Sequence, residues 1–370
     1  MKHSEKKLVL IGGGHSHALV LQRWASHPAA NTQVTLVSPH PYSPYSGMLP
    51  GLLAGHYDFA ETHIDLQRLC QKTGTQFIQQ AVTAIDHLQQ QITLANGQQL
   101  PYDVASINIG STPDQIIPGS KDFATPVKPI AEFLQHWARL RQDVEQHPGQ
   151  RITVIGGGAG SIEITMALAH VLKSYTPRIS LVTRATDILK DYPSRIRKQV
   201  RKALRQHQVE LLTDLNVSSI AAQQFFSHCQ GYPFDHLFLC TQASAAGWLH
   251  ESGLATDEYG FLQVNKYLQT LSADNLLAAG DCIHFQPHPL AKAGVYAVRE
   301  ADTLFHNLKS LCMGQTPVKP YRPQRNFLSL LALGGQYALG SKYGFSFSGH
   351  WVWRWKDRID RRFMAQFISD

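Results

Sequence analysis

The first apolar run of the chain predicts a buried parallel strand. It covers Leu8–Ile11 and is followed at once by three glycines, Gly12–Gly14. Consecutive apolar residues without alternation are typical of a strand that is buried on both faces. A helical stretch from His15 to about residue 24 and a second apolar run at Val34–Val37 follow. Together they predict a βαβ unit with a glycine-rich turn between strand and helix.

The same pattern occurs a second time. Arg151–Ile155 predicts another buried strand, and residues 156–160 form another glycine-rich turn. A helix to about Leu172 and a strand at Ile179–Val182 complete the second unit. Two such units predict an α/β fold with two Rossmann-like dinucleotide-binding domains.

Both turns have glycines where the pyrophosphate of a dinucleotide needs them. Gly12 and Gly156 permit the tight turn, and Gly14 and Gly158 let the backbone approach the phosphates. The pyrophosphate would then lie on the free amides at the helix N-terminus, where the helix dipole favours negative charge.

Other positions depart from the usual dinucleotide-binding pattern. The third glycine is replaced by His17 in the first unit and by Ser161 in the second, and the bulky ring of His17 requires a local adjustment. The acidic residue that usually ends the second strand is replaced by Ser38, and in the second unit by Thr183 followed by Arg184. An arginine at this place suits the 2′-phosphate of NADPH. The same arginine also fits an ordinary solvated surface position.

The chain between the two units predicts a small antiparallel sheet and then a crossing between domains. Val82–Ile85, Gln91–Leu94 and Gln99–Leu100 are short strands, the last two joined by an Asn-Gly turn. Val104–Ile109 predicts a buried strand that ends at Gly110. Prolines at positions 118 and 126 mark the crossing, a helix over residues 130–146 leads to the second glycine turn, and residues 237–240 predict a late strand.

A single carboxylate stands at the end of another late apolar strand. Residues 275–281 predict a strand whose final turn carries Asp281, and the segment from residue 289 predicts a helix that opens around Lys292 and runs to about Leu308. Open α/β sheets bind ligands at the carboxyl ends of their strands. We therefore predict one discontinuous domain, residues 1–117 and 254–318, with a second domain, residues 118–253, inserted in it.

The last part of the chain, residues 319–370, predicts a small α+β segment. Phe327–Phe347 is typical of an antiparallel meander, and Trp351–Ile368 of an amphipathic helix. The expected apolar stripe has arginines beside it, and such a helix suits an anionic membrane surface. Packing on the body of the protein or on a second subunit of a homodimer is the alternative. The stripe comprises Val352, Trp355, Ile359, Phe363 and Phe367, and the arginines are Arg354, Arg358 and Arg361.

Composition and charge limit the classes of protein to which the chain can belong. The chain has 370 residues, of which 43% are hydrophobic and 16% charged, which suits two domains with cores of their own. The net charge of +7 is scattered and has no nucleic-acid-binding motif beside it, so we expect no nucleic-acid partner. The five cysteines contain no C-x-x-C pair, and we expect neither a disulfide framework nor a metal site. No apolar run approaches a membrane span, so we expect a cytoplasmic protein, with peripheral contact to the inner face of the membrane left open.

These segments together resemble a known family. The chain is similar to the flavoproteins with two dinucleotide-binding domains, and within them to type II NADH dehydrogenases and sulfide:quinone oxidoreductases. It most resembles the flavoprotein domain that is fused ahead of selenide, water dikinase in some bacteria. The matching segments are residues 11–17, 44–51, 110–113, 279–282, 292–299 and 353–363.

The resemblance implies how the cofactors are divided between the two units. FAD would occupy the first, with His15, Ser38 and Gly110 among its neighbours and Asp281 on its ribityl chain. Residues 44–51, which include Pro50, would lie by the isoalloxazine ring. NADH or NADPH would occupy the second unit, with Glu163 near the nicotinamide end.

Two of these carboxylates also have plain structural explanations. Asp281 could cap a helix, and Glu163 could be a first-turn carboxylate that the helix dipole favours. Lys292 is the candidate for stabilising charge on the reduced flavin, and an ordinary surface lysine is the alternative. The sequence leaves these alternatives open.

We expect a small molecule as the electron acceptor. The sequence leaves three functions open. Without a C-x-x-C pair, disulfide chemistry beside the flavin is excluded, and Cys282 alone is best interpreted as a small core residue. A quinone is the simplest acceptor, which makes the chain an NAD(P)H:quinone-type dehydrogenase. A chalcogen oxidoreductase acting on sulfur or selenium compounds, and a flavin-binding module with a decayed nicotinamide site, are the alternatives.

Overall fold

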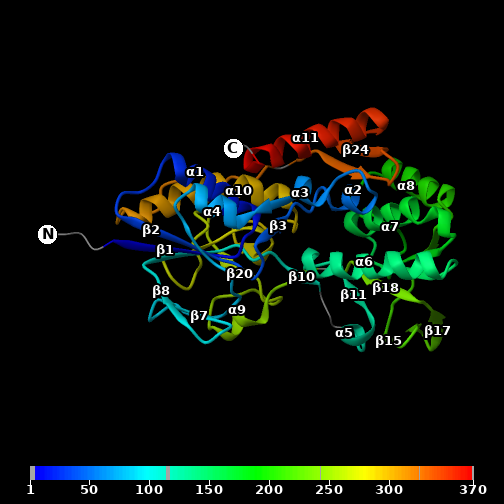
Figure 1. Cartoon of the computed structure of the whole chain (residues 1–370), viewed down its shortest axis with the longest axis horizontal. Helices are drawn as coiled ribbons and strands as arrows, with labels where there is room; N and C mark the ends of the chain where they lie inside the picture. Colours follow the sequence, from blue (N-terminus) through cyan, green and yellow to red (C-terminus); the bar gives the residue numbers. More distant parts are fainter. Residues whose placement is uncertain (1–4, 114–116, 242, 325, 369–370) are drawn as a thin grey trace.

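Two five-stranded sheets, each made of parallel strands, form the body of the protein (Figure 1). The computed structural model describes residues 5–113, 117–241, 243–324 and 326–368. The first sheet has the order β21-β9-β1-β2-β5, so its edge strand comes from a part of the chain that follows the whole second sheet. Its strands are β1 (Lys6–Ile11), β2 (Thr32–Val37), β5 (Gln76–Ile78), β9 (Val104–Ile107) and β21 (Leu276–Ala278).

The second sheet repeats this arrangement within one continuous stretch of chain. Its order is β11-β18-β12-β13-β14, and its strand pairs are parallel. Both βαβ units are therefore confirmed, while the domain boundaries at 117/118 and 253/254 stay predictions. The strands are β11 (Thr125–Pro126), β12 (Arg151–Ile155), β13 (Arg178–Val182), β14 (Glu210–Leu212) and β18 (His236–Leu239).

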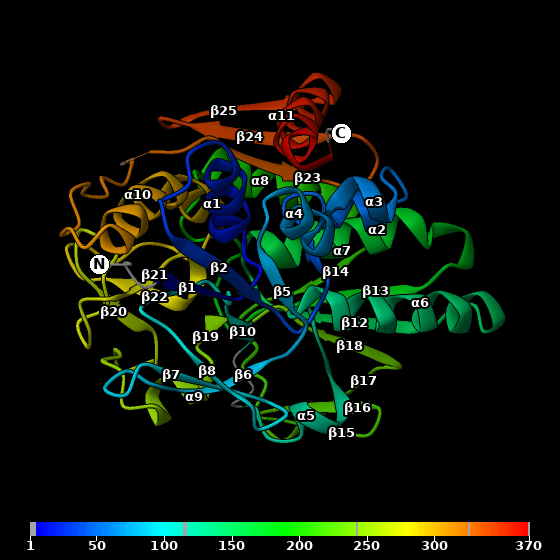
Figure 2. The same ribbon diagram turned by 60° about the vertical axis from the view of Figure 1, so that its left-hand side comes forward.

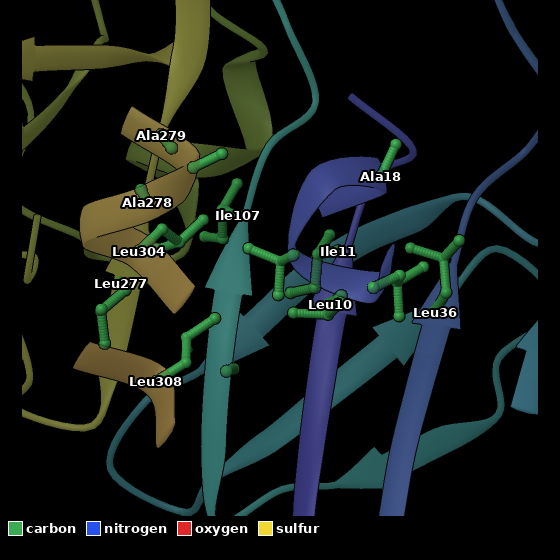
Figure 3. Packing of buried hydrophobic residues seen from close by; sticks show 14 of the residues in the cluster. Leu10, Ile11, Ala18, Leu36, Ile107, Leu277, Ala278, Ala279, Leu304 and Leu308 are labelled. Atoms are coloured by element: carbon green, nitrogen blue, oxygen red, sulfur yellow. The ribbon is translucent and has the colours of Figure 1, made fainter. Parts of the chain in front are cut away.

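Helices cover the sheets with their apolar faces. On the first sheet, α1 (His15–Ser26) and α10 (Gly294–Cys312) pack against each other, and Leu304 and Leu308 of α10 meet the apolar strand residues (Figure 3). The second sheet carries α6 (Ile130–Gln146), α7 (Ala159–Val171) and α8 (Ser194–Gln206). In α6 the buried residues recur at helical spacing, which explains why this segment forms a helix with one face on the sheet. They are Ile130, Phe133, Trp137, Leu140 and Val144.

Smaller elements complete the two halves. The predicted antiparallel sheet is confirmed as β6 (Val82–Asp86), β7 (Gln91–Leu94) and β8 (Gln99–Pro101). Between β2 and β5 the chain forms β3 (Tyr42–Pro44), α2 (Leu49–Leu53), α3 (Phe59–Thr62), β4 (His63–Asp65) and α4 (Leu66–Lys72). The others are β10 (Thr112–Pro113), α5 (Ser120–Phe123), η1 (Lys173–Tyr175), β15 (Ser219–Ala221), β16 (Gln224–Ser227), β17 (Gln230–Pro233), β19 (Ala243–Ser244), α9 (Gly247–Glu251), β20 (Leu262–Val264), η2 (Gly280–Cys282) and β22 (Ile283–Phe285).

The C-terminal segment lies across the body as a meander covered by one helix (Figure 2). The meander consists of β23 (Ser329–Ala332), β24 (Ala338–Lys342) and β25 (Phe345–Gly349), and the helix is α11 (His350–Ile368). The helix also contacts α3 and β4, so it joins the meander to the first half of the protein. In the part of the chain that the structure describes, no helix is both long and apolar enough to cross a membrane.

The predicted apolar stripe of the last helix is wrong in part. Val352 is fully buried, but Trp355 and Ile359 are each 39% exposed. The buried face instead continues through Lys356 and Asp360, which satisfy each other as an ion pair four residues apart. Burial of a charged pair at helical spacing cannot be read from a pattern of apolar residues alone.

The predicted start of the helix around Lys292 is also wrong. The helix α10 begins at Gly294, and Ala293 before it has an extended backbone. The Lys292 ammonium donates a hydrogen bond to the carbonyl of Ile283 and lies over the ring of Phe261. These contacts hold Lys292 in the connection that precedes the helix.

Candidate cofactor-binding site

The first glycine-rich turn packs tightly against the end of strand β9. Gly12 has a φ of +93°, which a residue with a side chain rarely adopts. A β-carbon at Gly14 would lie 2.1 Å from Oδ1 of Asn108. Directly after the turn, α1 begins with no acidic residue in its first turn, so its free amides present positive potential at the carboxyl edge of the sheet. This is the arrangement that binds a pyrophosphate.

Asn108 connects this turn to the rest of the first sheet. Its backbone carbonyl accepts a hydrogen bond from the Gly14 amide at 3.2 Å, and its side-chain Nδ2 donates to the carbonyl of Ala279 at 2.7 Å. The side chain is buried, so these bonds are protected from water. We did not predict this role, although a polar residue directly after a buried strand is the signal that could have indicated it.

His17 accounts for the missing third glycine. Its imidazole is fully buried, with Nδ1 2.7 Å from the carbonyl of Gly12 and Nε2 2.8 Å from Oγ of Ser106 on β9. Burial lowers the pKa of His17 to about 4, so the ring is neutral at physiological pH. The small Ser106 leaves room for the ring between helix and strand, which is the local adjustment that the sequence required.

Hydroxyl groups stand where a carboxylate usually ends the second strand. Ser38 is buried at the end of β2 and donates a hydrogen bond to the carbonyl of His40. A β-carbon at the neighbouring Gly13 would lie 3.3 Å from its Oγ. In the second unit, Thr183 lies in the same way against Gly157. The two turns are therefore built alike at this position.

Asp281 lies at the carboxyl edge of the first sheet and contacts a residue from the domain crossing. Its Oδ2 is 2.9 Å from Nζ of Lys128 and 3.4 Å from Oγ of Ser111, which follows Gly110. His15, at the start of α1, is close enough to feel the charges of both Asp281 and Lys128, and burial lowers its pKa. His15, Gly110 and Asp281, which the sequence predicted for one site, therefore share this edge.

Glu300 supports the turn that carries Asp281. This α10 side chain is only 1% exposed, and its Oε2 accepts a hydrogen bond from the Gly280 amide at 2.6 Å. Burial raises the pKa of Glu300 to about 7, because the charged carboxylate is poorly solvated there. Glu300 could not be predicted, since nothing in its local sequence distinguishes it from an exposed helical glutamate.

The second glycine-rich turn leaves more space than the first. A β-carbon at Gly156 would collide with the carbonyl of Cys240, but one at Gly158 would meet nothing within 4 Å. Gly158 precedes α7, whose first turn contains no acidic residue. The open backbone at Gly158 therefore leaves room for a ligand at this helix N-terminus. Arg184, after β13, is exposed.

A polar cluster lies where α7, the loop after β3 and the C-terminal helix meet. We call Tyr45, Glu163, Lys356 and Asp360 the junction cluster. The Lys356 ammonium contacts Asp360 at 2.6 Å and the Gly47 carbonyl at 2.5 Å. The Asp360 carboxylate also accepts a hydrogen bond from the Tyr45 hydroxyl. Burial raises the pKa of the Tyr45 hydroxyl and of the Asp360 carboxyl.

Glu163 is the member of this cluster that the sequence predicted. Its Oε1 accepts a hydrogen bond from the amide of Ala332 on β23 at 2.9 Å. Burial raises the pKa of Glu163 to about 7, and the nearby charge of Lys356 opposes this shift. The predicted Pro50 is buried in α2, which packs against α7. The structure therefore brings Glu163 and the segment of Pro50 to the same junction.

The side chain of Lys292 is half-buried, and that of Cys282 is fully buried. The Lys292 ammonium lies 3.7 Å from the centroid of the Phe261 ring, and burial lowers its pKa. Cys282 is fully buried, and burial raises the pKa of its thiol to about 12. The prediction that Cys282 is a small core residue is confirmed.

Comparisons with known proteins match most of the chain to one family. The sequence pattern of the pyridine nucleotide-disulphide oxidoreductase family matches residues 6–301. The NADH dehydrogenase-like protein YutJ of Bacillus subtilis is 22% identical over 346 residues, which cover 92% of each chain. The type II NADH:quinone oxidoreductase of Staphylococcus aureus is 21% identical and covers 98% of this chain and 96% of its own. Among solved structures, the sulfide:quinone oxidoreductase of Aquifex aeolicus superposes with a TM-score of 0.81 at 17% identity, covering 98% of this chain and 91% of its own.

The different surroundings of Gly14 and Gly158 predict different costs for the same substitution. Gly14→Ala forces its new methyl group into Asn108, and we expect it to cost about 1–3 kcal/mol of stability or more. Gly158→Ala adds a methyl group in open space at an extended backbone, and we expect the stability to change by less than about 0.5 kcal/mol. Thermal unfolding of the two flavin-free variants measures both effects. Equal losses would contradict the tight packing at Gly14.

The buried carboxyl of Glu300 predicts a pH-dependent stability. Its pKa is higher in the folded protein than the usual 4.5, so the folded state binds the proton more tightly and loses stability as the pH rises from about 4.5 through about 7. Glu300→Gln removes this loss. We expect it to be more stable than the native protein by about 2–3 kcal/mol above pH ~8 and nearly equal at pH ~5.

Chemical unfolding of the flavin-free proteins at the two pH values measures this difference. The exposed Glu210→Gln serves as the matched control and should give the same small difference at both. A pH-independent difference for Glu300→Gln would mean that the carboxyl has the same pKa in the folded and unfolded states.

Proposed function

Because the chain belongs to the pyridine nucleotide-disulphide oxidoreductase family, we propose that it is an FAD-dependent dehydrogenase that uses NAD(P)H and passes the electrons to a quinone-like acceptor. The junction cluster is the observation that carries the proposal. Reduction of a quinone consumes two electrons and two protons, and Glu163 is a half-buried carboxyl with a pKa of about 7 near a buried lysine and aspartate. Such a group can hold and release a proton at neutral pH.

The first glycine-rich turn would hold FAD and the second NADH or NADPH. Bound flavin supplies the hydride-accepting and electron-donating chemistry. The chain binds and orients the two cofactors, and the C-terminal segment excludes water from the junction. The FAD-binding residues would be Gly12, Gly14, His15, Ser38, Pro50, Gly110 and Asp281, and the NAD(P)H-binding residues Gly156, Gly158, Glu163 and Arg184.

The nucleotide preference follows from the end of strand β13. Thr183 and Arg184 leave no carboxylate that would repel a 2′-phosphate, and the exposed guanidinium of Arg184 can pair with one. We therefore favour NADPH over NADH. The hydroxyl of Thr183 would contribute a weaker hydrogen bond to the ribose.

The surroundings of the cysteines favour a quinone as the electron acceptor over electron transfer through cysteine sulfur. Cys282 and Cys240 are the cysteines after the carboxyl ends of β21 and β18, and burial raises the pKa of each thiol to about 12. A thiol with such a pKa supplies almost no thiolate at neutral pH. The chalcogen oxidoreductase therefore stays the second candidate, and its support is the predicted similarity to the flavoprotein fused to selenide, water dikinase.

An aromatic surface on the C-terminal segment fits a membrane-soluble acceptor. Trp351 and Trp355 of α11 stack with their rings 6.4 Å apart, and Tyr343 and Phe345 on the β24–β25 hairpin are also exposed. Arg354 and Arg358 of the same helix are also exposed. Aromatic and basic side chains together favour the headgroup region of an anionic membrane, and we propose peripheral contact on its cytoplasmic face.

Anaerobic mixing with each nucleotide tests the proposed function. We expect NADPH to bleach the flavin absorbance of the purified protein, faster than NADH does, and a water-soluble quinone to restore it. Bleaching by sulfide or selenide without nucleotide would favour the chalcogen oxidoreductase instead. No bleaching by any of these reductants would favour a flavin-binding module with a decayed nicotinamide site.

Lys292 is proposed to stabilise the negative charge of reduced flavin. A charged hydrogen bond contributes roughly 1.5–3 kcal/mol, so Lys292→Met should lower the two-electron midpoint potential by roughly 30–65 mV. Affinity for oxidised FAD should change little. A spectroscopic redox titration with parallel FAD binding checks both, and an unchanged potential would leave Lys292 with its contacts to Phe261 and Ile283 as its only role.

A further inference from the structure

Lys128 lies at the point where the chain enters the second sheet. The preceding residue, Val127, donates its amide to the carbonyl of Leu239, so the segment continues β11 along the carboxyl end of β18. Helix α6 begins two residues later, at Ile130. Lys128 is therefore fixed at the ligand-binding edge of the second sheet by backbone structure on both sides.

The side chain of Lys128 reaches across to the first sheet. Its Nζ is 2.9 Å from Oδ2 of Asp281 and 3.2 Å from Oγ of Ser111. Asp281 is more sheltered than Lys128, with 16% of its side chain exposed against 40%. The ion pair thus joins the entry of the second sheet to the turn that follows β21.

We propose that Lys128 is a positioning residue for FAD, which orients the ionised carboxylate of Asp281 toward the bound cofactor. The inference rests on the proposed FAD site in the first unit. Lys128 engages Oδ2, and a carboxylate with two oxygens keeps Oδ1 for a hydroxyl donor such as the ribityl chain. In this role Lys128 acts through Asp281.

The electrostatics favour the same role. A partly exposed ion pair contributes little by itself, because water screens it. A bound cofactor that covers Asp281 removes this water, and the carboxylate then needs a compensating charge. Lys128 contacts the carboxylate of Asp281 directly, whereas the hydrogen bond of Lys292 goes to the Ile283 carbonyl.

A double-mutant cycle on FAD binding tests the proposal. The dissociation constant of FAD is measured by titrating flavin-free protein and following flavin fluorescence. We expect Lys128→Met to weaken binding by about 10- to 100-fold, the range of a hydrogen bond to a charged group. Lys128→Arg should recover most of the loss, and Lys121→Met, at an exposed lysine of α5, should change little.

The double-mutant cycle distinguishes a positioning role of Lys128 from one in which Lys128 only joins the two halves of the protein. In the Asp281→Asn background, Lys128→Met should change the dissociation constant by less than about threefold, because the charge that it orients is gone. An equal loss in both backgrounds would overturn the proposal. So would an unchanged dissociation constant together with a lower melting temperature of the flavin-free Lys128→Met protein, since Lys128 would then only join the two halves.

The same titrations keep this inference apart from the proposed function. If the native protein binds FAD and Lys128→Met binds it equally well, only the role of Lys128 fails. If the native protein and all variants fail to bind FAD, the flavin site itself is wrong, and the role of Lys128 falls with it.

Discussion

Asn108 holds together the three segments that form the first candidate cofactor site. Its side chain fills the space beside Gly14 and donates a hydrogen bond to the carbonyl of Ala279, directly before the Asp281 turn, while its backbone carbonyl accepts one from the Gly14 amide. Because the side chain is buried, losing one of these bonds would leave an unsatisfied polar group inside the protein. The glycine turn, the end of β9 and the carboxylate turn therefore keep one fixed arrangement, and His15, Ser111 and Lys128 are placed relative to it.

The two glycine-rich turns look alike in the sequence but differ in their surroundings. The first is packed against protein atoms at Gly14, while the second is open at Gly158. A site formed by tightly packed backbone is preorganised and binds without reordering the chain, whereas an open turn can admit and release a ligand with little rearrangement. This difference suits a resident cofactor in the first unit and an exchanging one in the second.

Elements with strong periodicity were predictable, and contacts between distant segments were not. Strands β1 and β12 and helix α6 follow from apolar runs and helical spacing, because each depends on its local sequence. The start of α10 and the buried face of α11 were predicted wrongly. Lys292 is held before the helix by Ile283 and Phe261, and Lys356 is buried by its contact with Gly47 near the other end of the chain. For the same reason the glycines and Asp281 could be named from the sequence, but Asn108, Glu300 and Lys128 could not. Each of these three acts through a hydrogen bond or ion pair that only the folded arrangement reveals.

The late position of strand β21 has a consequence for how the protein comes to be folded. The second sheet uses one continuous stretch of chain, whereas the first is complete only when residues 276–278 pair with β9. The Asn108–Ala279 bond that locks this pairing spans 171 residues. Contacts of such high sequence separation form slowly, and domains made of continuous chain fold as units during synthesis. On the ribosome, the second sheet can therefore be complete while the first sheet still lacks its last strand.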